Sequence, residues 1–231
     1  MSDYPCIILN LYQTILDDSY GAGEREKYRV DSIYTILEKS LFPVKFNSLR
    51  KVYTESLDYS AKYEQEKGLA CGPFNQIDYL LQKLGIRDSV VFKKIYDSYI
   101  DAVLQISPRL RKNVIAALNL LKERGKKISV ISTSDKTPAD IVKLLLKELL
   151  VYNIFDDFIF SDGVGITKPL SVLVHLSLEK LHLKKKDAIY IGKLSSSDYN
   201  EMSNAGLSTH LFNDLEDDIY QLAIRYSGGY L

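Results

Sequence analysis

The sequence predicts an α/β fold: a doubly wound parallel sheet with a block of helices inserted after its first strand. Three observations lead to this prediction. The chain opens on an apolar run at residues 6–9, residues 24–105 show almost only helical periodicity, and short apolar runs alternate with helices after Pro108. Strands that alternate with helices at this spacing imply right-handed crossovers and parallel pairing. We therefore predict a core at residues 1–17 and 106–231 and a helical insertion at residues 18–105.

The helices of the insertion are predicted from apolar residues that recur every three or four positions. The four apolar faces cover residues 30–41, 49–57, 77–84 and 91–99. Gly68 and Gly85 end the second and third helices, and Asp88 is the expected N-cap of the fourth. Pro108 ends the block because its ring excludes a further helical turn.

After Pro108 the predicted strands are short buried apolar runs that alternate with amphipathic helices. The strands are expected at residues 128–132, 158–160, 188–191 and 209–212. Helices are expected at 114–121 and 141–149, after Pro169 and before Gly206. A last helix is expected to carry Leu215, Ile219 and Leu222 on its buried face.

The composition fits a globular protein with an ordinary hydrophobic core. Hydrophobic residues make up 46% and charged residues 26% of the 231 residues, and 30 basic side chains balance 30 acidic ones. A chain without net charge offers no general attraction for nucleic acid or an anionic membrane. No apolar run is long enough for a transmembrane helix, and the N-terminus lacks the basic start of a signal peptide. We therefore expect a cytoplasmic protein that binds neither nucleic acid nor membrane.

The cysteines and histidines predict neither a disulfide framework nor a metal site. Cys6 and Cys71 are expected to be buried thiols, and a bridge between them stays an alternative, chiefly for a hyperthermophilic source. The absence of Trp beside abundant Lys, Ile, Leu and Tyr favours a thermophile. His175, His182 and His210 are too far apart in the sequence to show ligand spacing.

Polar residues follow four of the predicted strands at their carboxyl ends. The segments are residues 10–14, 132–135, 162–168 and 193–198. In an open α/β sheet a ligand lies beyond these strand ends. The sequence therefore predicts one site that all four segments build.

These segments resemble, in order, the four motifs of the haloacid dehalogenase (HAD) superfamily. The stretches read Asn10-Leu-Tyr-Gln-Thr14, Val130-Ile-Ser132-Thr133, Ser161-Asp-Gly-Val-Gly-Ile-Thr-Lys168-Pro169, and Tyr190-Ile-Gly-Lys193 through Asp198 with Asn204-Ala-Gly-Leu after it. The insertion at residues 18–105 is similar in position to the superfamily's C1 cap. The resemblance implies a HAD-like Rossmannoid core with a cap domain.

The reaction that this resemblance implies needs residues that the chain lacks. In HAD phosphatases the first Asp of the first motif attacks phosphorus, the second protonates the leaving group, and a carboxylate of the fourth motif helps to hold Mg²⁺. Here these positions carry Asn10, Tyr12 and Lys193, and Gln13 replaces the Gly of the turn. An amide has no anionic oxygen for carboxylate attack.

Two explanations of Asn10 remain beside a naturally degenerate site. True 2-haloacid dehalogenases resemble Asp-x-Tyr-Gly-Thr at this point and use no metal, but they too need the attacking Asp. An Asn at position 10 alone would also fit an engineered, inactivating mutation. The further departures at Tyr12, Gln13 and Lys193 favour natural degeneration.

The hydroxyls and amines that remain at these four segments favour an anion site. They are Thr14, Ser132, Lys168 and Lys193, with Asp198 and Asp162 near by. Two amines and two hydroxyls near helix ends attract a phosphate or carboxylate, and Lys193 would supply the charge that a metal gives elsewhere. The alternative is that Lys193 pairs with Asp198 or another acid and only fills the former metal position.

We therefore predict a HAD-like pseudoenzyme that has lost hydrolase activity and acts by binding, in a regulatory, ligand-binding or assembly role. Its partner is an unidentified protein or a small anionic ligand. No cofactor is expected, and Mg²⁺ would bind, through Asp198, only if residual HAD activity exists. The alternative is a weak or unconventional HAD hydrolase, phosphatase-like or dehalogenase-like, that still uses Thr14, Ser132 and Lys168.

Overall fold

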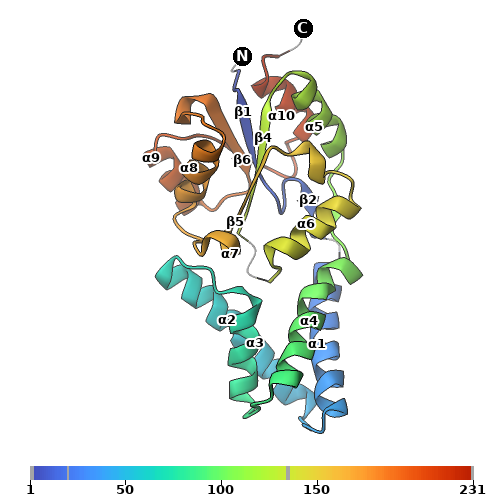
Figure 1. Ribbon diagram of the computed structural model, residues 1–231. Helices are drawn as coiled ribbons and strands as arrows, with labels where there is room; N and C mark the ends of the chain where they lie inside the picture. The colour runs from blue at the N-terminus through green and yellow to red at the C-terminus, as the bar shows by residue number, and fades with distance from the viewer. Residues whose placement is uncertain (1–2, 20, 134–135, 230–231) are drawn as a thin grey trace.

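The computed structural model describes residues 3–19, 21–133 and 136–229, and a five-stranded parallel sheet forms its centre (Figure 1). The strands run in the order β5-β4-β1-β6-β7. Their bounds are β1 Cys6–Asn10, β4 Lys127–Ser132, β5 Asp157–Phe160, β6 Ala188–Gly192 and β7 Ser208–Leu211. The first strand pairs with β4 and β6, so it lies in the middle of strands that come much later in the sequence. This confirms the predicted doubly wound α/β fold.

Helices cover both faces of the sheet, which is why the central strand is apolar along its length (Figure 1). On β1, Ile7 and Leu9 pack against one layer of helices, whereas Cys6 and Ile8 pack against the other. Successive side chains of a strand point to opposite faces, so all four are buried. The layer next to Ile7 and Leu9 contains α5 Val114–Glu123, α6 Ala139–Glu148 and α10 Ile219–Tyr226, and the layer next to Cys6 and Ile8 contains α8 Leu170–Lys180 and α9 Ser196–Asn204.

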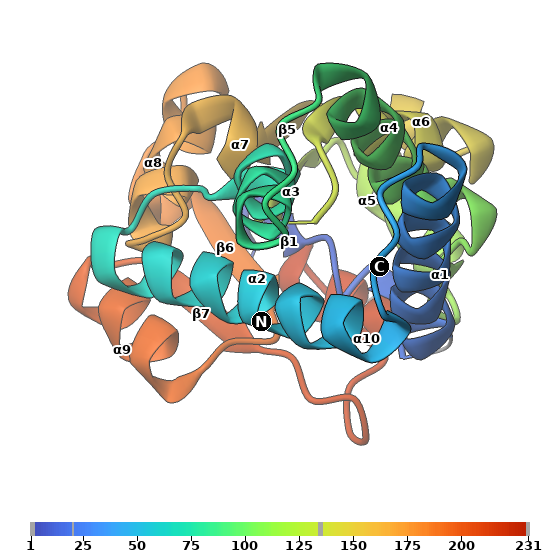
Figure 2. The same cartoon turned by 90° about the horizontal axis from the view of Figure 1, so that it is seen from below.

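The helical insertion lies beyond the carboxyl ends of the strands (Figures 1 and 2). Its helices are α1 Ala22–Lys39, α2 Phe46–Lys67, α3 Gly72–Lys83 and α4 Ser89–Gln105. They pack around a hydrophobic cluster of their own, in which Ile33, Leu49, Ile77 and Ile95 are buried. The insertion therefore has a separate core, and its surface next to the sheet forms one wall of the predicted site.

Two ends of these helices follow the sequence signals. The Asp88 carboxylate accepts hydrogen bonds from the backbone N–H groups of Val90 and Val91 at 2.8 and 2.9 Å, which confirms it as the N-cap of α4. Gly68 follows α2 with φ +67°, a left-handed conformation in which Gly has no steric cost.

Two short strands that the sequence did not predict hold the two connections of the insertion together. β2 Leu16–Asp17 and β3 Arg109–Leu110 pair antiparallel. Two residues are too few to show an alternating pattern, so periodicity could not reveal them. They hold the entering and leaving connections of the insertion side by side, next to the turn that follows β1.

The last strand and helix differ from expectation. The strand ends one residue early, and Phe212 is buried just after it. The prediction that Leu215 lies on the buried face of the last helix was wrong, because Leu215 precedes α10 and is 95% exposed. The Asp218 carboxylate accepts from the backbone N–H of Tyr220 at 2.8 Å and fixes the later start.

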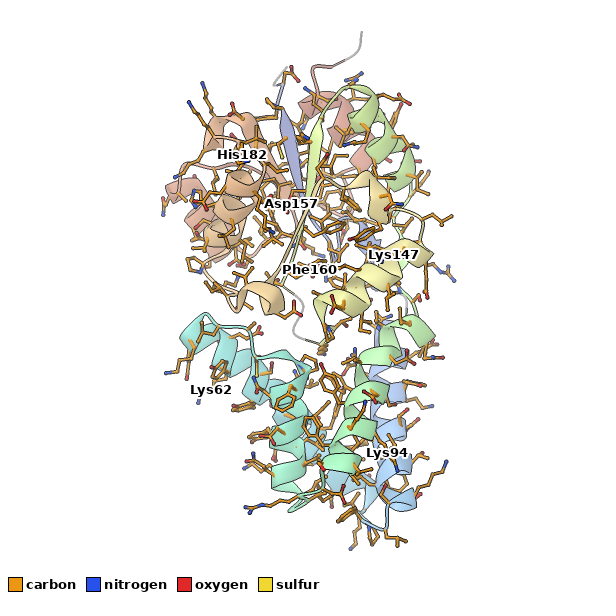
Figure 3. The ribbon with its side chains drawn as sticks, viewed as in Figure 1. Lys62, Lys94, Lys147, Asp157, Phe160 and His182 are labelled. Atoms are coloured by element: carbon orange, nitrogen blue, oxygen red, sulfur yellow. The ribbon has the colours of Figure 1, made fainter. Side chains whose placement is uncertain are left out.

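Three short helical elements complete the described part of the chain. These elements are η1 Tyr152–Ile154, α7 Ser161–Val164 and η2 Lys185–Asp187. Figure 3 labels residues of the core and of the insertion. Phe160 marks the end of β5 nearer the insertion, and Lys62 and Lys94 lie on the insertion itself (Figure 3).

Cys6 and Cys71 are buried thiols, as the sequence predicted. Burial, followed by the negative charge of Asp156, raises the pKa of Cys6 to about 12. The thiol of Cys6 therefore stays protonated at neutral pH. Within residues 3–19, 21–133 and 136–229, no helix has both the length and the apolar character that a bilayer crossing requires.

Candidate functional site

The chain turns back sharply after Asn10, the last residue of β1. The backbone N–H of Gln13 donates to the carbonyl oxygen of Leu16 at 2.8 Å. Gln13 has φ +63°, which costs an L residue about 1–2 kcal/mol. The turn that the first motif builds with Gly is thus retained here with Gln.

Gly192 allows the end of β6 to approach Asn10. A Cβ atom at position 192 would lie 2.8 Å from the Cβ of Asn10 and 3.0 Å from the hydroxyl oxygen of Tyr190. No side chain fits there, so the Gly of the fourth motif has a steric role in this chain. Lys193 follows it directly and enters the same site as Asn10.

A cavity of about 500 Å³ lies between the strand ends and the insertion. The core contributes Asn10, Tyr12, Thr133, Lys136 and Lys193, and α1 contributes Arg25, Glu26 and Arg29. The structure therefore brings together the positions of the first and fourth motifs, whereas no residue of the predicted segment 162–168 lines the cavity.

The other predicted anion-binding residues lie outside the cavity lining. Thr14 and Ser132 are buried at 0% and 2% exposure, and their hydroxyl oxygens have no hydrogen-bond partner among the described residues. Lys168 forms an ion pair with Asp198, which also accepts from the Ser195 hydroxyl at 2.8 Å. Although burial acts to raise it, the pKa of Asp198 is held below its usual value by these two donors.

Lys193 does not pair with Asp198. Its ammonium group lies 2.8 Å from Oδ2 of Asp214, and Arg111 donates to Oδ1 of the same carboxylate at 2.6 Å. This ion pair agrees with the alternative in which Lys193 pairs with an acid. The carboxylate of Asp214 carries one negative charge and contacts both Lys193 and Arg111, so one positive charge of the pair is not neutralised by it.

Helix α1 adds two buried arginines that the motifs did not indicate. Arg25 and Arg29 are 4% and 3% exposed. They continue the apolar face of Ile33 and Leu37 in steps of four residues. Arginines on an otherwise buried helix face are the sequence signal that could have identified them.

Hydrogen bonds hold both arginines in place. Arg25 forms an ion pair with Asp18 and donates to the carbonyl oxygen of Ile106. Arg29 donates to the carbonyl oxygen of Tyr99 at 3.2 Å, and its guanidinium carbon lies 4.6 Å from the centre of the Tyr99 ring. Their charges are therefore preorganised at the cavity wall.

Glu26 joins the insertion to the core across this cavity. Its Oε1 accepts from Arg29 at 2.6 Å and from Lys136, in the loop after β4, at 3.2 Å. Its Oε2 accepts from the Tyr53 hydroxyl at 2.6 Å. Although burial acts to raise it, the pKa of Glu26 is lowered by Lys136, Tyr53 and Arg29. Glu26 is thus an internal carboxylate that occupies part of a cationic site.

The cavity lining carries more positive than negative charge. The cations are Arg25, Arg29, Lys136 and Lys193, and the carboxylates are Asp18 and Glu26. Burial, followed by the charge of Asp18, raises the pKa of Tyr12 to about 12, so this phenol stays neutral at pH 7. Chemically, the cavity suits a small anion that accepts charge-assisted hydrogen bonds.

The residues at this site do not fit Mg²⁺, which prefers carboxylate oxygens and water. Asn10 offers only a neutral amide oxygen, Lys193 introduces an ammonium group, and Asp198 is paired with Lys168. Among the residues that the structure describes, no three His, Cys, Asp or Glu side chains are grouped to hold a metal ion.

Backbone hydrogen bonds also tie the insertion to the core beside Lys168. The carbonyl oxygen of Gly68 accepts from the N–H groups of Thr167 and Lys168 at 2.9 and 3.2 Å, and the N–H of Ala70 donates to the carbonyl oxygen of Gly165 at 3.1 Å. We call residues 68–70 and 165–168 the strap. The strap and the Glu26–Lys136 contact both connect the insertion to the core at this end of the sheet.

The family model for haloacid dehalogenase-like hydrolases matches residues 35–212, which is most of the chain. The protein belongs to this family. A 113-residue region is 30% identical to the glyceraldehyde 3-phosphate phosphatase of Methanocaldococcus jannaschii. The match covers 47% of this chain and 48% of that enzyme, so the chain spans about half the length of this relative.

Solved structures share the fold at low sequence identity. A 2-haloacid dehalogenase from Pseudomonas syringae is 16% identical with a TM-score of 0.70, covering 96% of each chain. A HAD phosphatase from Thermococcus onnurineus is 16% identical with a TM-score of 0.64, covering 100% of each chain. A magnesium-bound putative HAD-hydrolase from Bacillus subtilis is 15% identical with a TM-score of 0.60, covering 94% of this chain and 90% of that one.

Proposed function

We propose that this chain is a non-catalytic member of its family that binds a small anion between the core and the insertion. The observation that carries the proposal is the pair Asn10 and Lys193 at the positions of the family's nucleophile and metal-binding acid. Both side chains line one cavity. A carboxylate nucleophile is absent at the first position, and at the second a cation replaces an anion.

The charge of the cavity supports an anionic ligand. Arg29 and Lys136 converge on one carboxylate oxygen of Glu26, at 2.6 and 3.2 Å. An external phosphate or carboxylate that reaches these two donors would meet the geometry that Glu26 already uses. Guanidinium and ammonium donors form the stronger, charge-assisted hydrogen bonds with such oxygens.

Removing Lys136 is expected to weaken this binding. Lys136→Met should raise the Kd for inorganic phosphate about tenfold, because it removes one charge-assisted hydrogen bond. Isothermal titration calorimetry at low salt measures this. Lys143→Met is the matched control, since Lys143 has a similar side-chain exposure (37% against 32%), pairs with Asp140 on α6 and lies outside the cavity lining.

Two results would contradict the proposal. One is equal phosphate affinity in the Lys136 and Lys143 variants. The other is the absence of any heat at millimolar phosphate, with or without Mg²⁺.

Removing Glu26 is expected to have the opposite effect. Glu26→Gln takes away the internal carboxylate that competes for Arg29 and Lys136, so phosphate should bind about tenfold more tightly. The same change should lower the free energy of unfolding by about 1 kcal/mol, because the contacts to Lys136 and Tyr53 weaken. Glu24→Gln, an exposed acid on the first turn of α1, is the control. Weaker phosphate binding in Glu26→Gln would mean that the anion does not use these donors.

The alternative function, a weak or unconventional hydrolase, is favoured by the family and by the retained Lys168–Asp198 pair. A screen with phosphate esters and with 2-haloacids, each with and without Mg²⁺, tests it. Turnover in the unmodified chain that disappears in Lys168→Ala would establish this alternative and overturn the non-catalytic proposal.

A further inference from the structure

A second cavity, of about 520 Å³, lies in the insertion between α1 and α2. The view of Figure 2 shows both helices. We call it the groove. Its walls include Val30 from α1 and Phe46, Tyr53 and Leu57 from α2. Charged side chains such as Lys27 and Arg50 are exposed at its edge. The groove is thus mainly apolar, unlike the cationic cavity at the strand ends.

The groove and the cationic cavity meet at two residues of α1. Gly23 and Glu26 line both of them. Arg25 and Arg29 lie on the side of α1 that faces the cationic cavity, and Lys27 and Val30 on the side that faces the groove. One turn of α1 therefore separates a cationic surface from an apolar one.

Gly23 leaves this boundary open. A Cβ atom built at position 23 would meet no atom of the described residues within 4 Å, apart from its own helix and chain neighbours. Gly in the first turn of a helix costs stability relative to Ala, and no positive φ requires it here. The residue with the smallest volume thus lies at the boundary between the two cavities.

Glu26 and Tyr53 form the other side of the boundary. The Tyr53 hydroxyl donates to Glu26 at 2.6 Å, and Tyr53 lines the groove but not the cationic cavity. Burial of the phenol raises the pKa of Tyr53, and the neighbouring Tyr99 and Glu26 raise it further. Tyr53 therefore stays neutral and adds no charge to the groove.

We propose that the ligand of this protein is an amphiphilic anion. Its phosphate or carboxylate head would bind among Arg29, Lys136 and Lys193, and a single apolar chain would pass Gly23 into the groove. The charge of the first cavity selects the head, and the apolar walls of the second select the chain. This inference rests on the anion site of the proposed function and adds the chemical class of the ligand.

Monoalkyl phosphates from methyl to octyl test the inference by calorimetry, with inorganic phosphate as the reference. Each methylene that enters the groove should lower Kd by about three- to fourfold, until the groove is filled. The matching straight-chain carboxylates form a second arm and show which head the site prefers. A Kd that falls steadily with chain length in either series supports the proposal.

Variants at Gly23 and Leu57 locate the effect. Gly23→Leu should place a bulky side chain at the boundary between the two cavities and so remove the increase in affinity with chain length. Gly23→Ala, whose methyl group meets open space, is the matched control and should retain the gain. Leu57→Asn alters the opposite wall of the groove and lies outside the cationic cavity. It should reduce the increase in affinity with chain length without changing the Kd for inorganic phosphate.

The outcomes separate the two proposals. If neither inorganic phosphate nor any alkyl phosphate binds, the proposed anion site is wrong, and this inference falls with it. If inorganic phosphate binds and Kd does not change with chain length, the anion site stands and the amphiphile inference is overturned. A chain-length gain that persists unchanged in both Gly23→Leu and Leu57→Asn also overturns it, because the chain then binds elsewhere.

Discussion

Asn10→Asp by itself is expected to give no measurable Mg²⁺-dependent phosphatase activity. Loss of catalytic residues that act as a unit is not repaired one residue at a time, and each single loss removes about four orders of magnitude or more in rate. A restored Asp at position 10 would still lack the acid that Tyr12 replaces. It would also lie in a cavity that Lys193 lines with an ammonium group. Hydrolysis of p-nitrophenyl phosphate with and without Mg²⁺ measures the result.

The combined variant Asn10→Asp, Tyr12→Asp, Lys193→Asp is the informative comparison. It restores carboxylate oxygens where Mg²⁺ prefers them, so it should gain a Mg²⁺-dependent rise in Tm that the single variant lacks. Asn10→Ala serves as the inactive control. Activity in Asn10→Asp alone would show that the site was lost recently and would contradict a long-degenerate site.

Gly68→Ala is expected to lower the free energy of unfolding by about 2–4 kcal/mol, the largest stability effect of a single methyl group that we predict. Its Cβ would lie 2.7 Å from the carbonyl oxygen of Lys168, at a backbone φ of +67°. The obstacle is backbone, and the same oxygen and its neighbours belong to the strap. The clash therefore has to displace either the insertion or the loop that carries Lys168.

Gly85→Ala is the matched control for this change. Gly85 has φ +71°, but a Cβ there would meet nothing within 4 Å among the described residues. Gly85→Ala should lower the free energy of unfolding by only about 1–2 kcal/mol, the cost of a left-handed backbone for an L residue. Urea denaturation of both variants measures the difference. Equal losses would mean that the strap adjusts at no cost and does not fix the insertion.

The fold followed from the sequence because its signals are local. The residues of β1 are apolar on both faces, which only a strand covered on both sides requires. Asp88 begins α4 through its side chain, and Gly68 ends α2 through its backbone conformation, so each boundary depends on a single residue. Leu215 was assigned wrongly because the apolar spacing begins before Asp218, where the helix starts.

The site could be predicted only in part. Asn10, Tyr12 and Lys193 line the cavity because parallel strands bring their carboxyl ends to one edge. Lys168 is occupied by Asp198, and Thr14 and Ser132 lie beneath the surface. Which of several strand-end residues reaches a cavity depends on side-chain contacts between segments far apart in the chain.

The sequence by itself determined the family, the layered fold and the replacement of the attacking carboxylate by Asn10, because motifs and periodicity are written in neighbouring residues. Tertiary structure alone decided where the charges act. Arg29 and Lys136 come from α1 and from the loop after β4, and they meet on Glu26 only because the insertion folds back over the strand ends. Electrostatic interactions depend on distance in space, and packing of the insertion against the core sets that distance.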